Sequence, residues 1–502
     1  MLKSGPRYKR IVGALRSSPV VHRLARGAFW SLLGTFCARV LALVATIVIA
    51  KLLGVADYGA YAIIQSTLET FGLVAGFSLG GTTTKYLAEY RDKDKPKASR
   101  ILSLTNGFAL VSSGIVAALV FAFSGTIAND LLHRADLAPL LSLGAIYLFV
   151  SAQNTVQIGS LGGFEAFKET AKINVVQGIA APVLAVPLVY FLHLQGAMIA
   201  LIIVALIGYV LCRIELGRKC AASGIQLRRF DLSAVRESHV ILHFAIPSFA
   251  AALLVIPVTW LANTLLVNQP NGYAEMGLFS AANQWRQLVI YLPNVLAIVL
   301  LPVFSDFYAN RSQGEFRSVF DLNLGLAWMI ALPATIAVIA MRGVLASAFG
   351  SKYAGMDLLI IPLAITAFFN ILNNVVGTAI AGAGRMWVGA LLNACWATAM
   401  AACTWLLVPA LGATGLALSY MTSYLLHTAW TMAYAERKML PGAITRHWRL
   451  ISLTCITIIP AYLLAILNVT SVIADVFILA VALTPLVYVA SRWYRKHNDA
   501  RP

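Results

Sequence analysis

Long apolar stretches recur along the whole chain, and short polar or basic connections separate them. A helix needs about 20 predominantly apolar residues to cross the hydrocarbon core of a bilayer. The stretches therefore predict fourteen membrane-spanning helices and an all-α, polytopic integral membrane protein. The predicted spans cover residues 27–50, 58–82, 101–124, 138–160, 172–191, 197–215, 241–263, 274–304, 319–341, 356–381, 387–408, 413–434, 449–468 and 472–490.

The composition agrees with this pattern. Of the 502 residues, 60% are hydrophobic and 12% are charged, and the mean hydropathy is +0.80. Soluble domains carry about 25% charged residues. The first span contains Arg39 and is longer than the apolar core of a signal peptide, so we expect it to stay in the mature protein.

The basic residues are distributed unevenly between the two sides of the predicted membrane. Of the 38 Lys and Arg residues, 32 fall at the termini and in alternate connections on one side. The other side has four, which are Lys51, Arg134, Arg342 and Lys352. Lys and Arg accumulate on the cytoplasmic side of membrane proteins, so both termini are predicted to be cytoplasmic. Topology thus accounts for the net charge of +18, and no nucleic-acid partner is needed to explain it.

An internal repeat of six spans is visible in the register of short motifs. The second span opens with Asp57-Tyr58-Gly59 and the eighth with Glu275-Met276-Gly277, at an offset of 218. At an offset of 219, a second set of matches pairs Asn154, Gly163 and Asn174 with Asn373, Gly382 and Asn393. Each unit has an even number of spans, so both copies enter the membrane in the same direction. We expect two pseudo-symmetric six-helix lobes with a cavity between them.

The predicted domain organisation follows from this repeat. It comprises a basic cytoplasmic N-terminus, an N-lobe of spans 1 to 6, a basic cytoplasmic linker, a C-lobe of spans 7 to 12, and two last spans with a cytoplasmic C-terminus. These parts are residues 1–26, 27–216, 217–239, 240–434 and 435–502, respectively.

Several segments resemble the polysaccharide transporter family of the multidrug/oligosaccharidyl-lipid/polysaccharide exporter superfamily, which includes the O-antigen and lipid-linked oligosaccharide flippases. The resemblance is carried by residues 50–59 (AKLLGVADYG), 80–90 (GGTTTKYLAEY), 277–282 (GLFSAA) and 349–354 (FGSKYA). It implies a bacterial inner-membrane flippase that moves undecaprenyl-pyrophosphate-linked sugars from the cytoplasmic to the periplasmic leaflet by alternating access. Its expected partners are the lipid-linked oligosaccharide, membrane lipids and other polysaccharide assembly proteins.

Two arginines lie inside predicted spans, and they are the strongest candidate site residues. A charged side chain at the bilayer centre costs about 2.5 to 3.5 kcal/mol on insertion scales, so it usually faces a cavity or a partner. Arg39 is in the first span and Arg286 is deep in the eighth, the repeat counterpart of the second. Guanidinium groups bind phosphate oxygens in pairs and stay charged at physiological pH. Arg39 and Arg286 are therefore predicted to seat a pyrophosphate headgroup.

Glu69, midway along the second span, admits two interpretations. It can form a structural ion pair with Arg39, or it can gate Arg39 and couple transport to an ion. The amides Gln65 and Asn283 occupy equivalent positions in the two repeats, and we expect them to contact the sugar or the headgroup. Most other intramembrane amides are explained by hydrogen bonds between helices.

Other function classes fit the sequence less well. A cation-coupled or proton-coupled small-molecule antiporter of the same superfamily is the alternative, although such a protein would place carboxylates in its cavity. The eight histidines and six cysteines show no metal-ligand spacing, and no P-loop occurs. We therefore expect no metal, no cofactor and no enzymatic activity.

Overall fold

The computed structural model describes residues 19–226, 232–238, 245–309 and 313–466. The N-terminal half contains α2 Pro19–Leu53, α3 Val55–Gly76, α4 Leu79–Tyr90, α5 Lys95–Ala122, α6 Ser124–Thr126, η1 Ile127–Leu131, η2 Ala135–Leu137, α7 Ala138–Gly163 and α8 Phe167–Ser223. The connection contains η3 Leu232–Glu237. The C-terminal half contains α9 Ile246–Leu253, α10 Ile256–Val267, α11 Gly272–Ala309, α12 Gln313–Ala340, α13 Arg342–Ser347, η5 Ser351–Tyr353, α14 Met356–Gly382, α15 Met386–Lys438, α16 Ala443–Arg446 and α17 Trp448–Ile466.

The all-α membrane fold predicted from the sequence is confirmed. In the described part of the chain every regular element is a helix, and eight helices there are long and apolar enough to cross a membrane. Thirteen of the fourteen predicted spans coincide with described helices, two of them on α8 and two on α15. The fourteenth, residues 472–490, lies outside the described residues.

Two predicted spans are interrupted rather than continuous. In the span at 241–263, the described residues begin at 245 and divide into α9 and α10; Pro257 stands in the first turn of α10, where its missing N–H donor costs nothing. The span at 58–82 ends at Phe77 and Ser78, which both adopt left-handed backbone conformations, and α4 then begins. Phe77 stacks on Phe249 of α9, with ring centroids 4.5 Å apart. The break between α3 and α4 therefore lies at a contact between the two halves.

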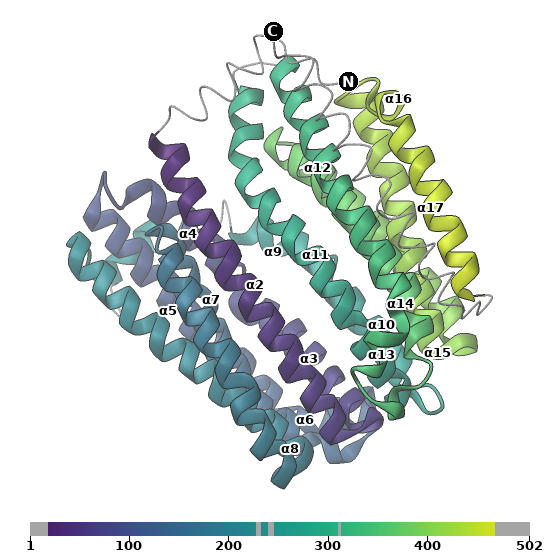
Figure 1. Cartoon of the computed structure of the whole chain (residues 1–502). Coiled ribbons are helices and arrows are strands. Elements are labelled where there is room, and N and C mark those ends of the chain that lie inside the picture. Colours follow the sequence, from purple (N-terminus) through teal and green to yellow (C-terminus); the bar gives the residue numbers. More distant parts are fainter. Residues whose placement is uncertain (1–18, 227–231, 239–244, 310–312, 467–502) are drawn as a thin grey trace.

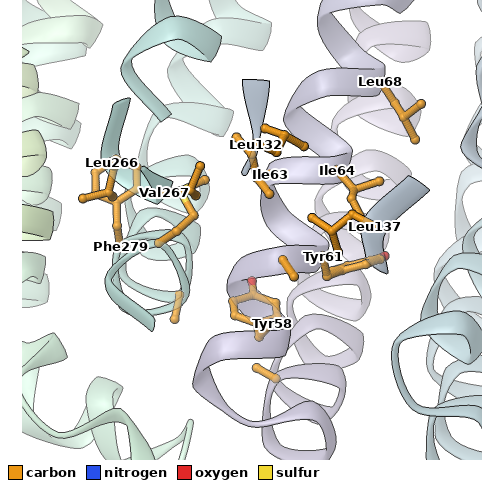
Figure 2. Close-up of a cluster of buried hydrophobic side chains, with 14 of the residues drawn as sticks. Tyr58, Tyr61, Ile63, Ile64, Leu68, Leu132, Leu137, Leu266, Val267 and Phe279 are labelled. Atoms are coloured by element: carbon orange, nitrogen blue, oxygen red, sulfur yellow. The ribbon is translucent and has the colours of Figure 1, made fainter. Parts of the chain in front are cut away.

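The largest hydrophobic cluster joins the two halves at one end of the bundle. Figure 2 shows Tyr58, Ile63 and Ile64 of α3 in this cluster, together with Leu266 of α10 and Phe279 of α11. A second cluster fills the C-terminal half between α11, α12 and α14. In Figure 1 helices α2 to α8 lie on one side and α10 to α17 on the other, with α9 between them.

The glycines of the repeated motif bring the two halves into backbone contact. A Cβ atom added to Gly59 would lie 1.8 Å from the carbonyl oxygen of Tyr273, and one added to Gly277 would lie 2.0 Å from that of Val55. Small residues allow such an approach of helix backbones in membranes. Nearby, the Tyr353 hydroxyl donates to the carbonyl of Ala50 at 3.0 Å. We call this end of the bundle, where α2 turns into α3 and α11 begins, the closed end.

Two further hydrogen bonds connect the two halves at the closed end. We call this contact surface between the halves the seam. The Tyr273 hydroxyl donates to the carbonyl of Leu132 at 2.7 Å, and Asn268 Nδ2 donates to that of Leu131 at 3.0 Å. The Nδ1 atom of His133 also lies 3.0 Å from Asn268 Oδ1. Polar contacts at the rim of the closed end thus reinforce the apolar contacts beneath it.

The turns inside α8 and α15 have the same backbone geometry and occupy equivalent positions in the repeat. His193 has φ 48° and ψ −128°, and Gly412 has φ 54° and ψ −130°. Each turn is followed by a glycine, Gly196 or Gly415, packed against the carbonyl of Leu188 or Leu407. These dihedrals belong to the first central position of a type II′ turn, which strongly favours glycine. The conformation suits Gly412 in the turn of α15, but in the turn of α8 it is adopted by a histidine, His193.

Replacing His193 by glycine should raise the stability of the protein. A positive φ destabilises a non-glycine residue in the folded state by about 1 to 3 kcal/mol. Glycine relieves this strain, but it also raises the entropy of the unfolded chain, which cancels part of the gain. We expect a net gain of about 1 kcal/mol for His193→Gly and a loss for Gly412→Ala. Thermal unfolding in detergent measures both, and a lower melting temperature for His193→Gly would contradict this account.

Candidate functional site

The three predicted charged site residues lie at one depth in the bundle. Arg39 precedes the end of α2 at Leu53, whereas Glu69 follows the start of α3 at Val55 and Arg286 follows the start of α11 at Gly272. Each of the three residues is separated from the named end of its helix by the same length, about four turns. This places all three roughly 21 Å from the closed end. Arg39 and Glu69 come from the first half, and Arg286 comes from the second.

The guanidinium of Arg39 reaches across the seam. Its Nη2 atom donates to Oε1 of Gln284 on α11 at 3.5 Å. The charges of Glu69 and Arg286, and the hydroxyl of Tyr291, lie near enough to act on Arg39 electrostatically. Within the described part of the chain no carboxylate lies within 4.0 Å of Arg39, so the predicted structural ion pair with Glu69 is absent from this conformation.

Arg286 is buried and is held in place by neutral groups. Its Nε atom donates to Oδ1 of Asn283, one turn earlier on α11. Its guanidinium carbon lies 5.1 Å from the ring centroid of Tyr420 on α15, a cation–π contact. Only 7% of its surface is accessible. Asn283, predicted to touch the substrate, therefore contacts and orients Arg286.

Glu69 marks a hollow inside the bundle. Its charge acts on Arg39 of α2, Tyr147 of α7 and Tyr420 of α15, and yet the residue is exposed. An exposed side chain with neighbours on three other helices indicates an open space between those helices. Gln65, one turn nearer the closed end on the same face of α3, is half-buried and donates from Nε2 to the Tyr61 hydroxyl at 3.1 Å. The hollow is thus bounded toward the closed end by Gln65 and the tyrosines beyond it.

Sequence reasoning missed a group of aromatic and amide residues around the arginines. Gln284 contacts Arg39, and Tyr58, Tyr291 and Tyr420 lie beside one or other guanidinium. Tyrosine is common in membrane helices and has no distinctive spacing here, so only the arrangement of the helices identifies these residues. Among the described residues no group of three His, Cys, Asp or Glu side chains could hold a metal ion.

The fold is shared with solved structures of a lipid flippase and of a multidrug transporter. The lipid II flippase MurJ, solved in an inward closed conformation, matches 92% of this chain and 98% of its own length with a TM-score of 0.71 and 14% identity. An inward-facing multidrug resistance transporter of the MATE family matches 81% of this chain and 97% of its own with a TM-score of 0.64 and 16% identity.

Sequence comparison identifies the family. The model of the polysaccharide biosynthesis protein family matches residues 24–308, more than half of the chain, and the protein belongs to that family. A putative O-antigen transporter of Shigella flexneri is 22% identical over 79% of this chain and 94% of its own length. The EPS I polysaccharide export inner membrane protein EpsE of Ralstonia solanacearum is 23% identical over 38% of this chain and 43% of its own. The resemblance seen in the sequence is confirmed.

The glycine contact at the closed end should control the separation of the two halves. Gly59→Ala places a methyl group against the Tyr273 carbonyl, whereas Gly72→Ala on the same helix meets nothing within 4 Å. Overpacking costs about 1 to 3 kcal/mol, so Gly59→Ala should reduce the ratio of closed to open protein roughly 5- to 150-fold.

Spin labels report this separation. The labels replace the exposed Lys51 and Lys352 in a background without the six native cysteines. Longer distances for Gly59→Ala, with Gly72→Ala unchanged, are the expected result. Equal distance distributions in the two variants would show that the glycine contact does not hold this end shut.

Proposed function

We propose that the protein is a flippase for lipid-linked oligosaccharides that carry a pyrophosphate headgroup. The observation that carries the proposal is the pair Arg39 and Arg286, one guanidinium from each half, at equal depth and close enough to act on each other electrostatically. The named functions of the relatives, O-antigen transport and polysaccharide export, support the same substrate class.

The chemistry of the two arginines suits a diphosphate. A guanidinium presents planar N–H donors that match phosphate oxygens, and its charge is retained in a site of low polarity. The partners of both arginines in this conformation are neutral: Gln284 for Arg39, and Asn283 and the Tyr420 ring for Arg286. Neutral partners leave the positive charge available to an anionic ligand.

Transport in this proposal requires no covalent chemistry. The two lobes rock about the headgroup, which sits in the hollow while the isoprenoid tail stays in lipid beside an opening between the lobes. With both termini in the cytoplasm of a bacterial inner membrane, the closed end is periplasmic. The structure then corresponds to a state that is shut toward the periplasm. The domain boundaries predicted above define the two rocking bodies.

A drug or cation antiporter of the same superfamily is the competing function. Such a transporter attracts its substrate with negative charge. Here the charges of one carboxylate, Glu69, and of a second guanidinium, Arg286, both act on Arg39, and the sum of the three charges is positive. The anionic substrate is favoured for that reason.

Removing either guanidinium should weaken headgroup binding strongly. A hydrogen bond to a charged group contributes about 1.5 to 3 kcal/mol, which corresponds to roughly 10- to 150-fold in affinity. We expect Arg39→Ala and Arg286→Ala to reduce flipping of a lipid-linked oligosaccharide in proteoliposomes by this factor. Lysine variants should fall between alanine and wild type, because lysine keeps the charge but cannot bind in bidentate fashion.

Arg218→Ala is the matched control, since that side chain is 70% exposed and pairs with Glu215 at the surface. Its flipping rate should equal that of the native chain. Native flipping rates in folded Arg39→Ala and Arg286→Ala proteins would rule out the proposed seat.

Glu69→Gln should separate binding from release. Removing the carboxylate makes the hollow more positive, so a pyrophosphate lipid should bind several-fold more tightly and leave more slowly. We expect higher affinity together with a lower flipping rate, and a weaker response to an imposed pH gradient. Glu169→Gln, which changes a surface carboxylate paired with Lys219, is the control. Unchanged flipping and unchanged pH response in Glu69→Gln would exclude the gating role.

A further inference from the structure

Gln284 lies between the closed end and the two arginines. We call Arg39 and Arg286 together the arginine seat. Its Oε1 atom accepts from Nη2 of Arg39 at 3.5 Å, and its side chain also interacts with the hydroxyl of Tyr58. One amide therefore touches a residue of the hollow and a residue of the seam. It belongs to the second half, while both of its partners belong to the first.

Tyr58 is built into the closed end. It is 2% exposed, and its ring packs edge-on against Tyr353, with centroids 6.3 Å apart. The hydroxyl of Tyr353 in turn binds the carbonyl of Ala50. The residue after Tyr58 is Gly59, which forms the backbone contact with α11. A shift of Tyr58 cannot leave these contacts unchanged.

The repeat shows that this position bonds across the seam in both halves. Residue 284 corresponds to Ser66 at the offset of 218, and the Ser66 hydroxyl accepts from Nδ2 of Asn263 on α10 at 2.9 Å. The serine side chain is too short to contact an arginine as well, whereas the longer glutamine at position 284 contacts Arg39. The longer amide thus links the ligand site to a contact that in the first half is structural.

We propose that Gln284 is a positioning residue that links occupancy of the arginine seat to opening of the closed end. This inference rests on the proposed function. A phosphate oxygen binds a guanidinium more strongly than a neutral amide oxygen does. An arriving pyrophosphate therefore displaces Gln284 from Arg39, and the amide moves away from Tyr58. The buried Tyr58 hydroxyl then loses its partner, which destabilises the closed end.

The expected size of this coupling is a shift of roughly 5- to 150-fold in the ratio of closed to open protein, the usual range for linked sites. Such a link prevents the empty transporter from opening readily toward the far side of the membrane. It also makes the presence of a phosphate, rather than of a lipid tail, the signal for opening.

Farnesyl pyrophosphate is a suitable probe, with farnesol as the control that lacks the phosphates. Binding is measured by calorimetry, and opening is measured by spin labels at Lys51 and Lys352, both on the full chain in nanodiscs. In the native protein farnesyl pyrophosphate should bind and lengthen the label distance, and farnesol should not lengthen it. Absence of pyrophosphate binding would contradict the proposed function itself.

Two variants remove the link without touching the arginines. Gln284→Met and Tyr58→Phe should bind the probe within about threefold of the native affinity but lose the probe-induced change in distance. Gln287→Met, one turn along α11, should behave like the native chain. If Gln284→Met and Tyr58→Phe open normally with the probe, the inference is overturned while the flippase proposal stands.

Gln284→Glu provides a test with the opposite sign. A carboxylate at this position would bind Arg39 more strongly than the amide and would compete with the pyrophosphate. We expect at least tenfold weaker binding of the probe and a closed end that stays shut. A merely structural role for Gln284 would predict loss of closure in every variant, so tighter closure in Gln284→Glu separates the two explanations.

Discussion

The positive charge of an intramembrane guanidinium is the constraint on which this structure depends. Arginine does not lose its proton at physiological pH, so the protein must supply water or polar groups wherever it places one inside the bilayer. Here Arg39 and Arg286 come from opposite halves and lie at the same depth. Amide and aromatic side chains therefore contact both guanidinium groups.

The seam and the hollow have opposite character, and transport requires a balance between them. Glycine contacts and a cluster of buried aromatic and aliphatic side chains hold the closed end together. Around the arginines the contacts between halves are amide and hydroxyl groups. No hydrophobic driving force acts between helices in a membrane, so close packing is what holds the closed end together.

The repeat explains why one chain can build both features. The same motif supplies Gly59 and Gly277 for the closed end, and the turns at His193 and Gly412 share one geometry. The copies have diverged where function differs. Leu68 occupies the position that Arg286 holds in the second half, and the first half supplies its charge from Arg39 on α2 instead. The symmetry of the scaffold is thus combined with an asymmetric site.

The sequence by itself determined the membrane class, the positions of thirteen described spans, the family and the two intramembrane arginines, because each follows from local composition or from the cost of a charge in lipid. It did not determine the breaks at Phe77 and before α10, the partner of Arg39, or the role of Gln284. Those depend on which helix faces lie opposite each other across the seam. Helices in a membrane are apolar on every side, so hydrophobic periodicity does not encode their mutual rotation, and only tertiary packing decides it.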